Sequence, residues 1–215
     1  MNKDEIVKRI LSSIILIPTV LFFIIKGSFL FNFFIFICFL ITTYEWLKLS
    51  KNNLLKFFGT IFIVISFYAI FKIRNEFDKD YFHLLLVVII CASTDIGGYL
   101  FGNIFKGPKL TKISPKKTYS GVIGSFLLSL IFTNLFLDFS SNVKSFEFTK
   151  EMFLFILLVS FISQIGDIIV SYFKRKSKIK DTGTIIPGHG GILDRIDGMI
   201  FALPFFYVFF LNLNF

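Results

Sequence analysis

Seven long apolar runs restrict what this chain can fold into more than any other feature of the sequence. None alternates polar and apolar residues as a barrel strand does, and their lengths suit helices that cross a bilayer. The 33 phenylalanines and the 55% of hydrophobic residues exceed what a soluble core of 215 residues can bury. The sequence therefore predicts an all-α, polytopic membrane helix bundle with about seven transmembrane helices. The runs cover roughly residues 10–25, 29–47, 54–73, 82–102, 120–138, 151–172 and 193–213.

Two points at the N-terminal end need interpretation. The basic start and the first apolar run resemble a cleavable signal peptide, but no small-residue cleavage site follows, which favours an uncleaved span. A turn at 26–28 would join the first two spans as a hairpin. The second run is the least secure, because Glu45 and Trp46 near its end are typical of a membrane interface.

The basic residues predict how the bundle is oriented. Of the 23 lysines and arginines, 16 lie on one side if there are seven spans, and six lie on the other. The positive-inside rule therefore predicts a cytoplasmic N-terminus and an external C-terminus. The net charge of +9 is then mostly an orientation signal, and no nucleic-acid partner is needed to explain it. The 16 residues are Lys3, Lys8, Arg9, Lys48, Lys51, Lys56, Lys106, Lys109, Lys112, Lys116, Lys117, Lys174, Arg175, Lys176, Lys178 and Lys180.

Five aspartates lie within, or at the cytoplasmic ends of, the fourth, sixth and seventh spans. A carboxylate inside a span costs about 2.5–3.5 kcal/mol on insertion scales, so it normally has a partner and a function. The five are Asp95, Asp167, Asp181, Asp194 and Asp197.

The sixth span carries a polar stripe. Its members are spaced by three or four residues and therefore share one helix face, which runs from mid-span to the cytoplasmic basic loop. Packing between helices is the favoured role for Ser160 and Ser163, whereas a functional role is favoured for Asp167. The stripe consists of Ser160, Ser163, Asp167, Ser171 and Lys174.

The segment KDTGTIIPGHGGILDRID, residues 180–197, combines backbone freedom with charge. Its glycines at 188, 190 and 191 can adopt positive φ and present N–H groups to an anion. Asp194 and Asp197 are three residues apart and project to the same side. Together with Asp167 they would bind a hard divalent cation, with Mg²⁺ favoured when phosphates share the site. The alternative is a set of interfacial salt bridges with nearby lysines. His189 by itself is weak evidence for a site.

The fourth span ends in a second polar segment. Asp95 and Tyr99 are one turn apart, and Gly98 and Gly102 permit close approach of another helix. The stretch GNIFKGPK is not a phosphate-binding loop, because Pro108 stands where that motif needs lysine.

Two basic loops, several acids and flexible glycines at one membrane face suit a phosphorylated substrate bound with Mg²⁺. Positioning and charge neutralisation carry most of a phosphoryl or nucleotidyl transfer, which is the reaction class that this inventory favours. Residues 1–215 then form one integral membrane domain, with N-terminal spans in 1–80 and catalytic spans in 82–213. The cytoplasmic loops of the catalytic spans are 103–119 and 173–192.

The segment SYFKRKSKIKDTGTIIPGHGGILDRID, residues 171–197, resembles the signature of the phosphatidate cytidylyltransferase (CDP-diacylglycerol synthase) family. That signature is a Ser, then Lys-Arg, Lys-Asp, His-Gly-Gly and Asp-Arg-x-Asp at these spacings. The segment ISPKKTYSG also resembles the family, although Ser120 stands where a glutamate is expected. The resemblance covers roughly residues 90–200, and the chain is shorter than expected for the family by one or two early spans.

The resemblance implies transfer of CMP from CTP to phosphatidic acid, giving CDP-diacylglycerol and pyrophosphate with Mg²⁺ and, as an open alternative, a second metal ion. It implies an active site on the cytoplasmic face of a bacterial-type inner membrane, and it leaves a homodimer open. The metal would be held by Asp167, Asp194 and Asp197, which with Lys174 form the catalytic set. The remaining candidate substrate-binding residues are Asp95, Lys116, Lys117, Ser171, Arg175, Lys180, Asp181, His189, Gly190, Gly191 and Arg195.

Four other functions compete with this interpretation. A CTP-dependent kinase of a lipid alcohol would need a base for its nucleophile, whereas the phosphate of phosphatidic acid is already ionised near neutral pH. A CDP-alcohol phosphotransferase has a spaced Asp/Gly/Arg pattern that is absent here. A transporter predicts internal symmetry and polar groups on both sides of the midplane. A purely structural membrane protein leaves the aspartates unexplained.

Overall fold

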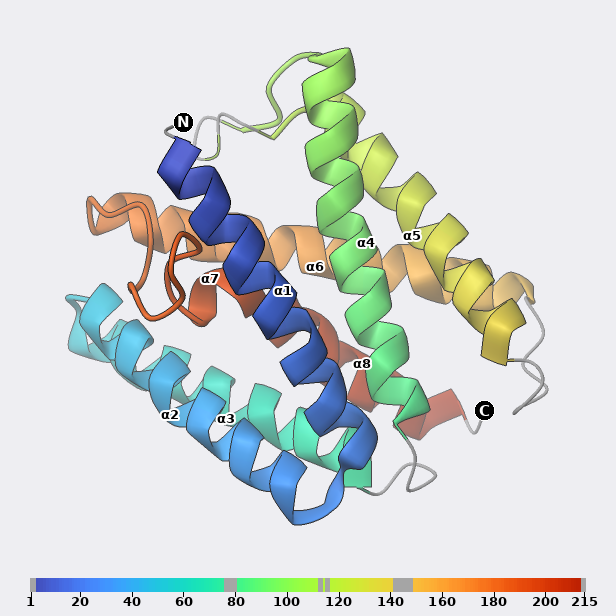
Figure 1. Cartoon of the computed structure of the whole chain (residues 1–215), viewed down its shortest axis with the longest axis horizontal. Coiled ribbons are helices and arrows are strands. Elements are labelled where there is room, and N and C mark those ends of the chain that lie inside the picture. The colour runs from blue at the N-terminus through green and yellow to red at the C-terminus, as the bar shows by residue number, and fades with distance from the viewer. Residues whose placement is uncertain (1–2, 76–80, 112–113, 115–116, 141–148, 214–215) are drawn as a thin grey trace.

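The computed structural model describes residues 3–75, 81–111, 114, 117–140 and 149–213. These residues form helices joined by loops, without a named strand, and six helices are long and apolar enough to cross a membrane. The helices are α1 (Lys3–Lys26), α2 (Ser28–Leu49), α3 (Asn53–Asn75), α4 (Phe82–Phe105), α5 (Tyr119–Ser140), α6 (Lys150–Lys176), α7 (Leu193–Ile196) and α8 (Met199–Leu213) (Figure 1). The predicted helix bundle is therefore confirmed, and the first six spans match their helices within a few residues, except that α1 begins earlier.

The predicted seventh span is wrong as one continuous helix. The chain forms the short α7, breaks at Asp197 and Gly198, and continues as α8, whose 15 residues are fewer than a span needs. The break has a local cause, since the Gly198 N–H donates to Asp197 Oδ1 at 3.0 Å. Gly198 also packs against Ser163 of α6, where a side chain would not fit.

Helix α8 contains Pro204, which cannot donate an N–H to the carbonyl of Ile200. Ser66 of α3 replaces that donor, because its hydroxyl donates to the Ile200 carbonyl at 2.6 Å. An unsatisfied carbonyl in an apolar interior costs several kcal/mol, so this bond fixes α3 against α8 at the proline.

The α1–α2 hairpin is confirmed. Gly27 and Ser28 both have positive φ, 62° and 53°, and turn the chain back on itself. Arg74 at the end of α3 closes the turn: its Nε donates to the Ile24 carbonyl at 2.7 Å and its Nη2 to the Ile25 carbonyl at 3.2 Å. The last carbonyls of α1 are thereby satisfied.

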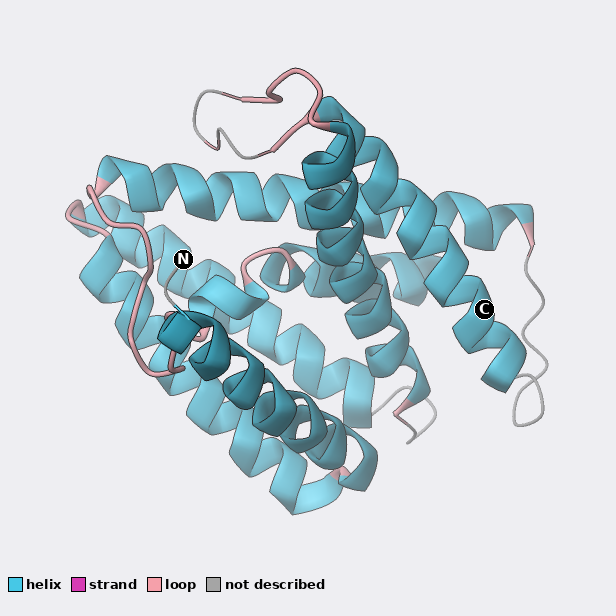
Figure 2. Ribbon diagram, turned by 45° about the horizontal axis from the view of Figure 1, so that its top comes forward, coloured by secondary structure: helices cyan, strands magenta, loops and turns pink. Residues whose placement is uncertain are grey.

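Small residues bring α4 and α5 into backbone contact, and these two helices run side by side in both views (Figures 1 and 2). A Cβ on Gly121 would lie 2.8 Å from the Gly98 carbonyl, and one on Gly97 would overlap the Gly124 carbonyl. Ser125 also donates to the Thr94 carbonyl at 2.7 Å. The close approach expected of Gly98 and Gly102 is confirmed, because Gly102 faces Gly121.

Helix α6 runs across the bundle and contacts α4, α5 and α8. Thr94 of α4 donates to Ser160 of α6 at 2.8 Å, and Ser163 is buried against Gly198. The packing role favoured for these two serines is confirmed. The lower part of the same stripe, from Asp167 to Lys174, is thereby directed towards α4, α5 and α7.

Gly97→Ala tests how far the bundle depends on the α4–α5 contact. The added methyl must push the two backbones apart, and overpacking of this kind costs about 1–3 kcal/mol. We expect a clear fall in the melting temperature of the detergent-solubilised protein. Gly107→Ala is the control, because the nearest atom to its Cβ would be the Ser120 hydroxyl oxygen at 3.3 Å. Equal melting temperatures for the two variants would contradict the close packing.

Candidate functional site

A cavity of about 390 Å³ gathers polar residues from four parts of the chain. Helix α4 contributes Asp95, the segment before α5 contributes Lys117, and α6 contributes Asp167. The structure thus brings together most of the charged residues singled out in the sequence, although up to 102 residues separate them. We call this cavity the polar pocket. Its charged lining residues are Asp95, Lys117, Asp167, Lys174, Asp194, Arg195 and Asp197.

Opposite charges alternate along one wall of the polar pocket. Lys117 Nζ lies 2.6 Å from Asp167 Oδ2 and also donates to the Gln164 carbonyl at 3.2 Å. The other oxygen of Asp167 accepts from the Ser171 hydroxyl at 3.2 Å. Asp167 is therefore held by the loop before α5 and by its own helix, and it remains partly exposed to the cavity.

Lys174 is buried near the C-terminal end of α6 between two aspartates. Its Nζ lies 3.0 Å from Asp194 Oδ1 and 3.5 Å from Asp197 Oδ2. This confirms that Asp194 and Asp197 project to the same side. Burial and the nearby Asp167 carboxylate raise the pKa of Asp197 well above its ordinary value, against the opposing charge of Lys174. The lysine partly neutralises a cluster of acids in a water-poor region.

Asp194 is fully occupied by protein donors. Its Oδ1 faces Lys174, and its Oδ2 accepts from Thr182 N at 2.7 Å, Gly191 N at 2.9 Å and the Thr182 hydroxyl at 3.0 Å. Burial raises the pKa of Asp194, but these N–H donors and the Lys174 charge outweigh it and hold the pKa below the ordinary value. Asp194 therefore remains ionised and anchors the loop of residues 181–191 to α7.

Glu45 is a residue beside the site that the sequence analysis did not select as a candidate. It is buried on α2, with only 2% of its surface exposed. Its carboxylate accepts from Ile192 N at 3.1 Å and Leu193 N at 2.8 Å, and its Oε2 lies 3.1 Å from the Thr182 hydroxyl, which Asp194 shares. The signal that could have revealed it is the one used for Asp95, a single acid inside an apolar run.

The loop of residues 181–191, which we call the glycine loop, packs against the carboxylates of Glu45 and Asp194. Gly188 and Gly190 have positive φ, as expected, but Gly191 does not. A Cβ on Gly183 would lie 2.6 Å from Glu45 Oε1, and one on Gly190 would lie 2.6 Å from Asp194 Oδ2. The glycines therefore make room for buried carboxylates.

Two of the three loop N–H groups expected to bind an anion have partners within the protein. Gly190 N donates to the Ile186 carbonyl at 3.1 Å, and Gly191 N donates to Asp194. Both groups are used inside the loop, because the loop must satisfy its own backbone where it is buried.

His189 faces α1 and does not line the polar pocket. Its Nδ1 lies 2.6 Å from the Ser12 hydroxyl and its Nε2 lies 3.3 Å from the Ser13 hydroxyl. Burial and the positive charge of Arg195 lower its pKa, so the ring is neutral near pH 7. His189 thus fastens the glycine loop to α1.

Three further candidates lie outside the polar pocket. Lys180 and Asp181 are exposed on the loop, and Arg175 donates to the Ile179 carbonyl at 3.3 Å beyond the end of α6. Lys116 lies outside the described residues. The side chains of Ser114, Thr118 and Gln164, which the sequence analysis did not select, do line the polar pocket.

The predicted metal ligands are not assembled as a set. Within the described parts of the chain, no three His, Cys, Asp or Glu side chains form a group that could hold a metal ion. Four carboxylates line the polar pocket, and Asp194 is the one whose Oδ2 already accepts the donors of Thr182 and Gly191, so Asp95, Asp167 and Asp197 are the better candidates to hold an ion. Their oxygen donors fit a hard cation such as Mg²⁺ by chemistry.

The known proteins that this chain resembles are cytidylyltransferases. The profile of the family described as "Cytidylyltransferase family" matches residues 54–213, from α3 to the end of α8. A phosphatidate cytidylyltransferase of Rickettsia typhi is 34% identical over 211 residues, covering 96% of this chain and 92% of the relative. That of Rickettsia felis is 34% identical over 218 residues, covering 99% and 94%. That of Haemophilus influenzae is 39% identical over 170 residues, covering 75% and 59%. The shortness expected from the resemblance therefore applies to some relatives and not to others.

Glu45→Ala tests the anchoring of the glycine loop. Removing the carboxylate leaves the buried N–H donors of Ile192 and Leu193 unpaired, at about 1–3 kcal/mol for a buried donor. We expect faster proteolysis within residues 181–191, together with a lower melting temperature. Leu47→Ala, on the exposed side of the same helix, is the matched control. Unchanged proteolysis in Glu45→Ala would remove this role from Glu45.

Proposed function

The chain belongs to the cytidylyltransferase family, and from this premise we propose that it transfers CMP from CTP to phosphatidic acid, giving CDP-diacylglycerol and pyrophosphate. The observation that carries the proposal is the polar pocket, which joins acids and cations from α4, α6, α7 and the loop before α5. These elements all lie within or beside the segment that matches the family. The relatives with the same printed activity support the choice of substrates.

The proposed reaction needs little acid–base chemistry from the protein. An oxygen of the lipid phosphate attacks the α-phosphorus of CTP, a new P–O bond forms, and the bond to the β-phosphate oxygen breaks. Pyrophosphate leaves with the electron pair. Because the lipid phosphate is already ionised, no strong base is required, and stabilising negative charge becomes the main task. Lys117, Lys174 and Arg195 are the cations of the polar pocket that suit this task.

We propose Mg²⁺ as the cofactor. Asp167 and Asp197 would hold it, with Asp95 nearby, since all three line the polar pocket. When bound, the ion would supply Lewis-acid neutralisation of the triphosphate. The chain's own residues would set its place: Ser171 and Lys117 orient the Asp167 carboxylate, and Lys174 orients Asp197. Asp194 acts in this scheme as the anchor of the glycine loop.

The proposed location is the inner membrane of a bacterial cell, with the polar pocket on the cytoplasmic face. The chain has six helices with the length and composition of membrane spans, and its relatives are bacterial. The pocket lies at the ends of α4 and α6 that adjoin the two strongly basic loops. Basic loops favour the cytoplasm, which is also where CTP is available.

Pyrophosphate release from labelled CTP tests the proposed function. With purified protein in detergent, we expect release only when phosphatidic acid and Mg²⁺ are both present, and a CDP-lipid as product. Transfer of the γ-phosphate to a lipid alcohol would instead identify a lipid kinase. Release without phosphatidic acid would contradict the proposed acceptor.

Asp197→Asn and Asp194→Asn separate the two acidic roles. We expect both to lower turnover on the order of 100-fold or more, because each removes a charge from the polar pocket. Only Asp194→Asn should also speed proteolysis of residues 181–191, since Asp194 anchors that loop. Asp138→Asn, on the exposed part of α5, should leave both readouts unchanged. Normal turnover in Asp197→Asn would exclude that carboxylate from the reaction.

A further inference from the structure

A second cavity, of about 300 Å³, borders α7 as the polar pocket does, through Arg195 and Ile196. Helices α1, α2, α3, α4 and α8 and the apolar part of the glycine loop line it, with residues such as Leu16, Phe34, Cys38 and Val88. We call it the apolar cavity. Arg195 is the one charged residue among the described residues that line it.

Arg195 also lines the polar pocket, and no other described residue lines both cavities. It is an exposed residue of α7, and its guanidinium makes no hydrogen bond or ion pair with the described part of the chain. By contrast, Lys117 and Lys174 are both paired with aspartates. A free guanidinium between a polar and an apolar space suits an amphipathic ligand with an anionic head.

We propose that the apolar cavity holds an acyl chain of the lipid substrate, while the lipid phosphate binds the Arg195 guanidinium and faces the polar pocket. The inference rests on the proposed function and adds to it the place and orientation of the lipid. The nucleotide then reaches the phosphate from the polar side and the hydrocarbon stays in the apolar cavity. The two substrates meet at Arg195 and nowhere else.

An adjoining apolar space extends the cavity towards the cytoplasmic end of α1. This space measures about 420 Å³ and shares Leu16, Val20, Phe34, Ile185 and Ile186 with the apolar cavity. Ile185 and Ile186 are an apolar pair in the glycine-rich loop of residues 181–191, and lining these spaces gives them a role. The second acyl chain of the same lipid lies here, with α1 as the outer wall of both spaces.

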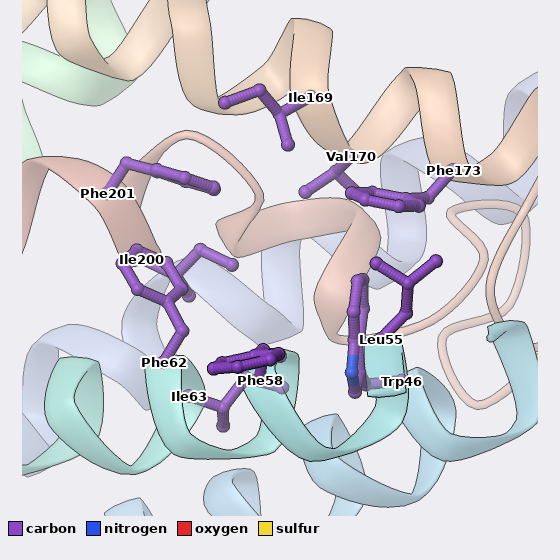
Figure 3. Close-up of a pocket in the computed structure, with 11 residues that line it drawn as sticks. Trp46, Leu55, Phe58, Phe62, Ile63, Ile169, Val170, Phe173, Ile200 and Phe201 are labelled. Carbon is purple, nitrogen blue, oxygen red and sulfur yellow. The ribbon is translucent and has the colours of Figure 1, made fainter. Parts of the chain in front are cut away.

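The apolar cavity is lined by a charged residue, Arg195, whereas another apolar cavity has none in its described lining. Figure 3 shows a cavity of about 220 Å³ between α2 and α3 on one side and α6 and α8 on the other. Trp46, Phe62, Phe173 and Phe201 line it, and its described lining contains no charged residue and shares none with the polar pocket. A lipid placed there would have no cation for its phosphate, so this cavity serves as the control.

The test compares phosphatidic acids of different chain length. Cys38→Phe places a ring in the apolar cavity, and we expect the KM for dioleoyl phosphatidic acid to rise about tenfold. The KM for CTP and the rate with a dihexanoyl acceptor should stay close to those of the unaltered protein. Ile169→Phe fills the cavity of Figure 3 and should leave the ratio of long-chain to short-chain activity unchanged. An equal effect of both variants on that ratio would overturn the proposal.

A second measurement uses the unaltered protein, so it does not depend on the folding of a variant. Phosphatidic acid with a diazirine at the end of one acyl chain is first shown to yield CDP-lipid with CTP, and is then photolysed on the protein. We expect labelled peptides from α1, α2 and α4. Labels confined to the residues of Figure 3 or to outward-facing side chains would overturn the proposed location. Failure of the unaltered protein to form any CDP-lipid would instead overturn the proposed function.

Discussion

The ion pairs of buried Lys174 with Asp194 and Asp197 are the interaction on which the site depends. A charged side chain away from water is costly unless it is paired, and Lys174 has two carboxylates within 3.5 Å. These pairs join the end of α6 to the chain break between α7 and α8. Once they form, Asp194 is positioned to gather the N–H groups of the glycine loop, and Glu45 of α2 gathers those at the start of α7.

Small residues position the side of the polar pocket that α4 and the loop before α5 form. Gly97, Gly98 and Gly121 let α4 touch the backbone of α5, which sets Asp95 beside the loop that carries Lys117. Gly166 of α6 similarly lies where a Cβ would be 2.9 Å from the Asp197 carbonyl. Close packing of this kind leaves the charged side chains as the main groups that face the polar pocket.

The proposed reaction joins a water-soluble nucleotide to a lipid, so its site must open to two environments. Arg195 lines both the polar pocket and the apolar cavity. Asp194 and Arg195 are neighbours in the four-residue helix α7, but they have different surroundings. Asp194 faces inward and holds the loop, while Arg195 remains unpaired among the described residues.

Much of the fold and part of the site were predictable from the sequence. The apolar runs determined the six long spans, because the bilayer admits few other structures. The spacing of Asp167, Ser171 and Lys174 determined their common face, and Gly98 and Gly102 indicated a helix contact. Only the tertiary structure decided which charges pair and which stay free. Glu45 meets Leu193 across 148 positions, and Lys174 occupies Asp194, which the sequence analysis had assigned to a metal. Such pairings depend on which side chains are buried together in the folded protein. Helical periodicity predicts the helix face on which a residue lies, but it does not predict which residue of another helix will contact it.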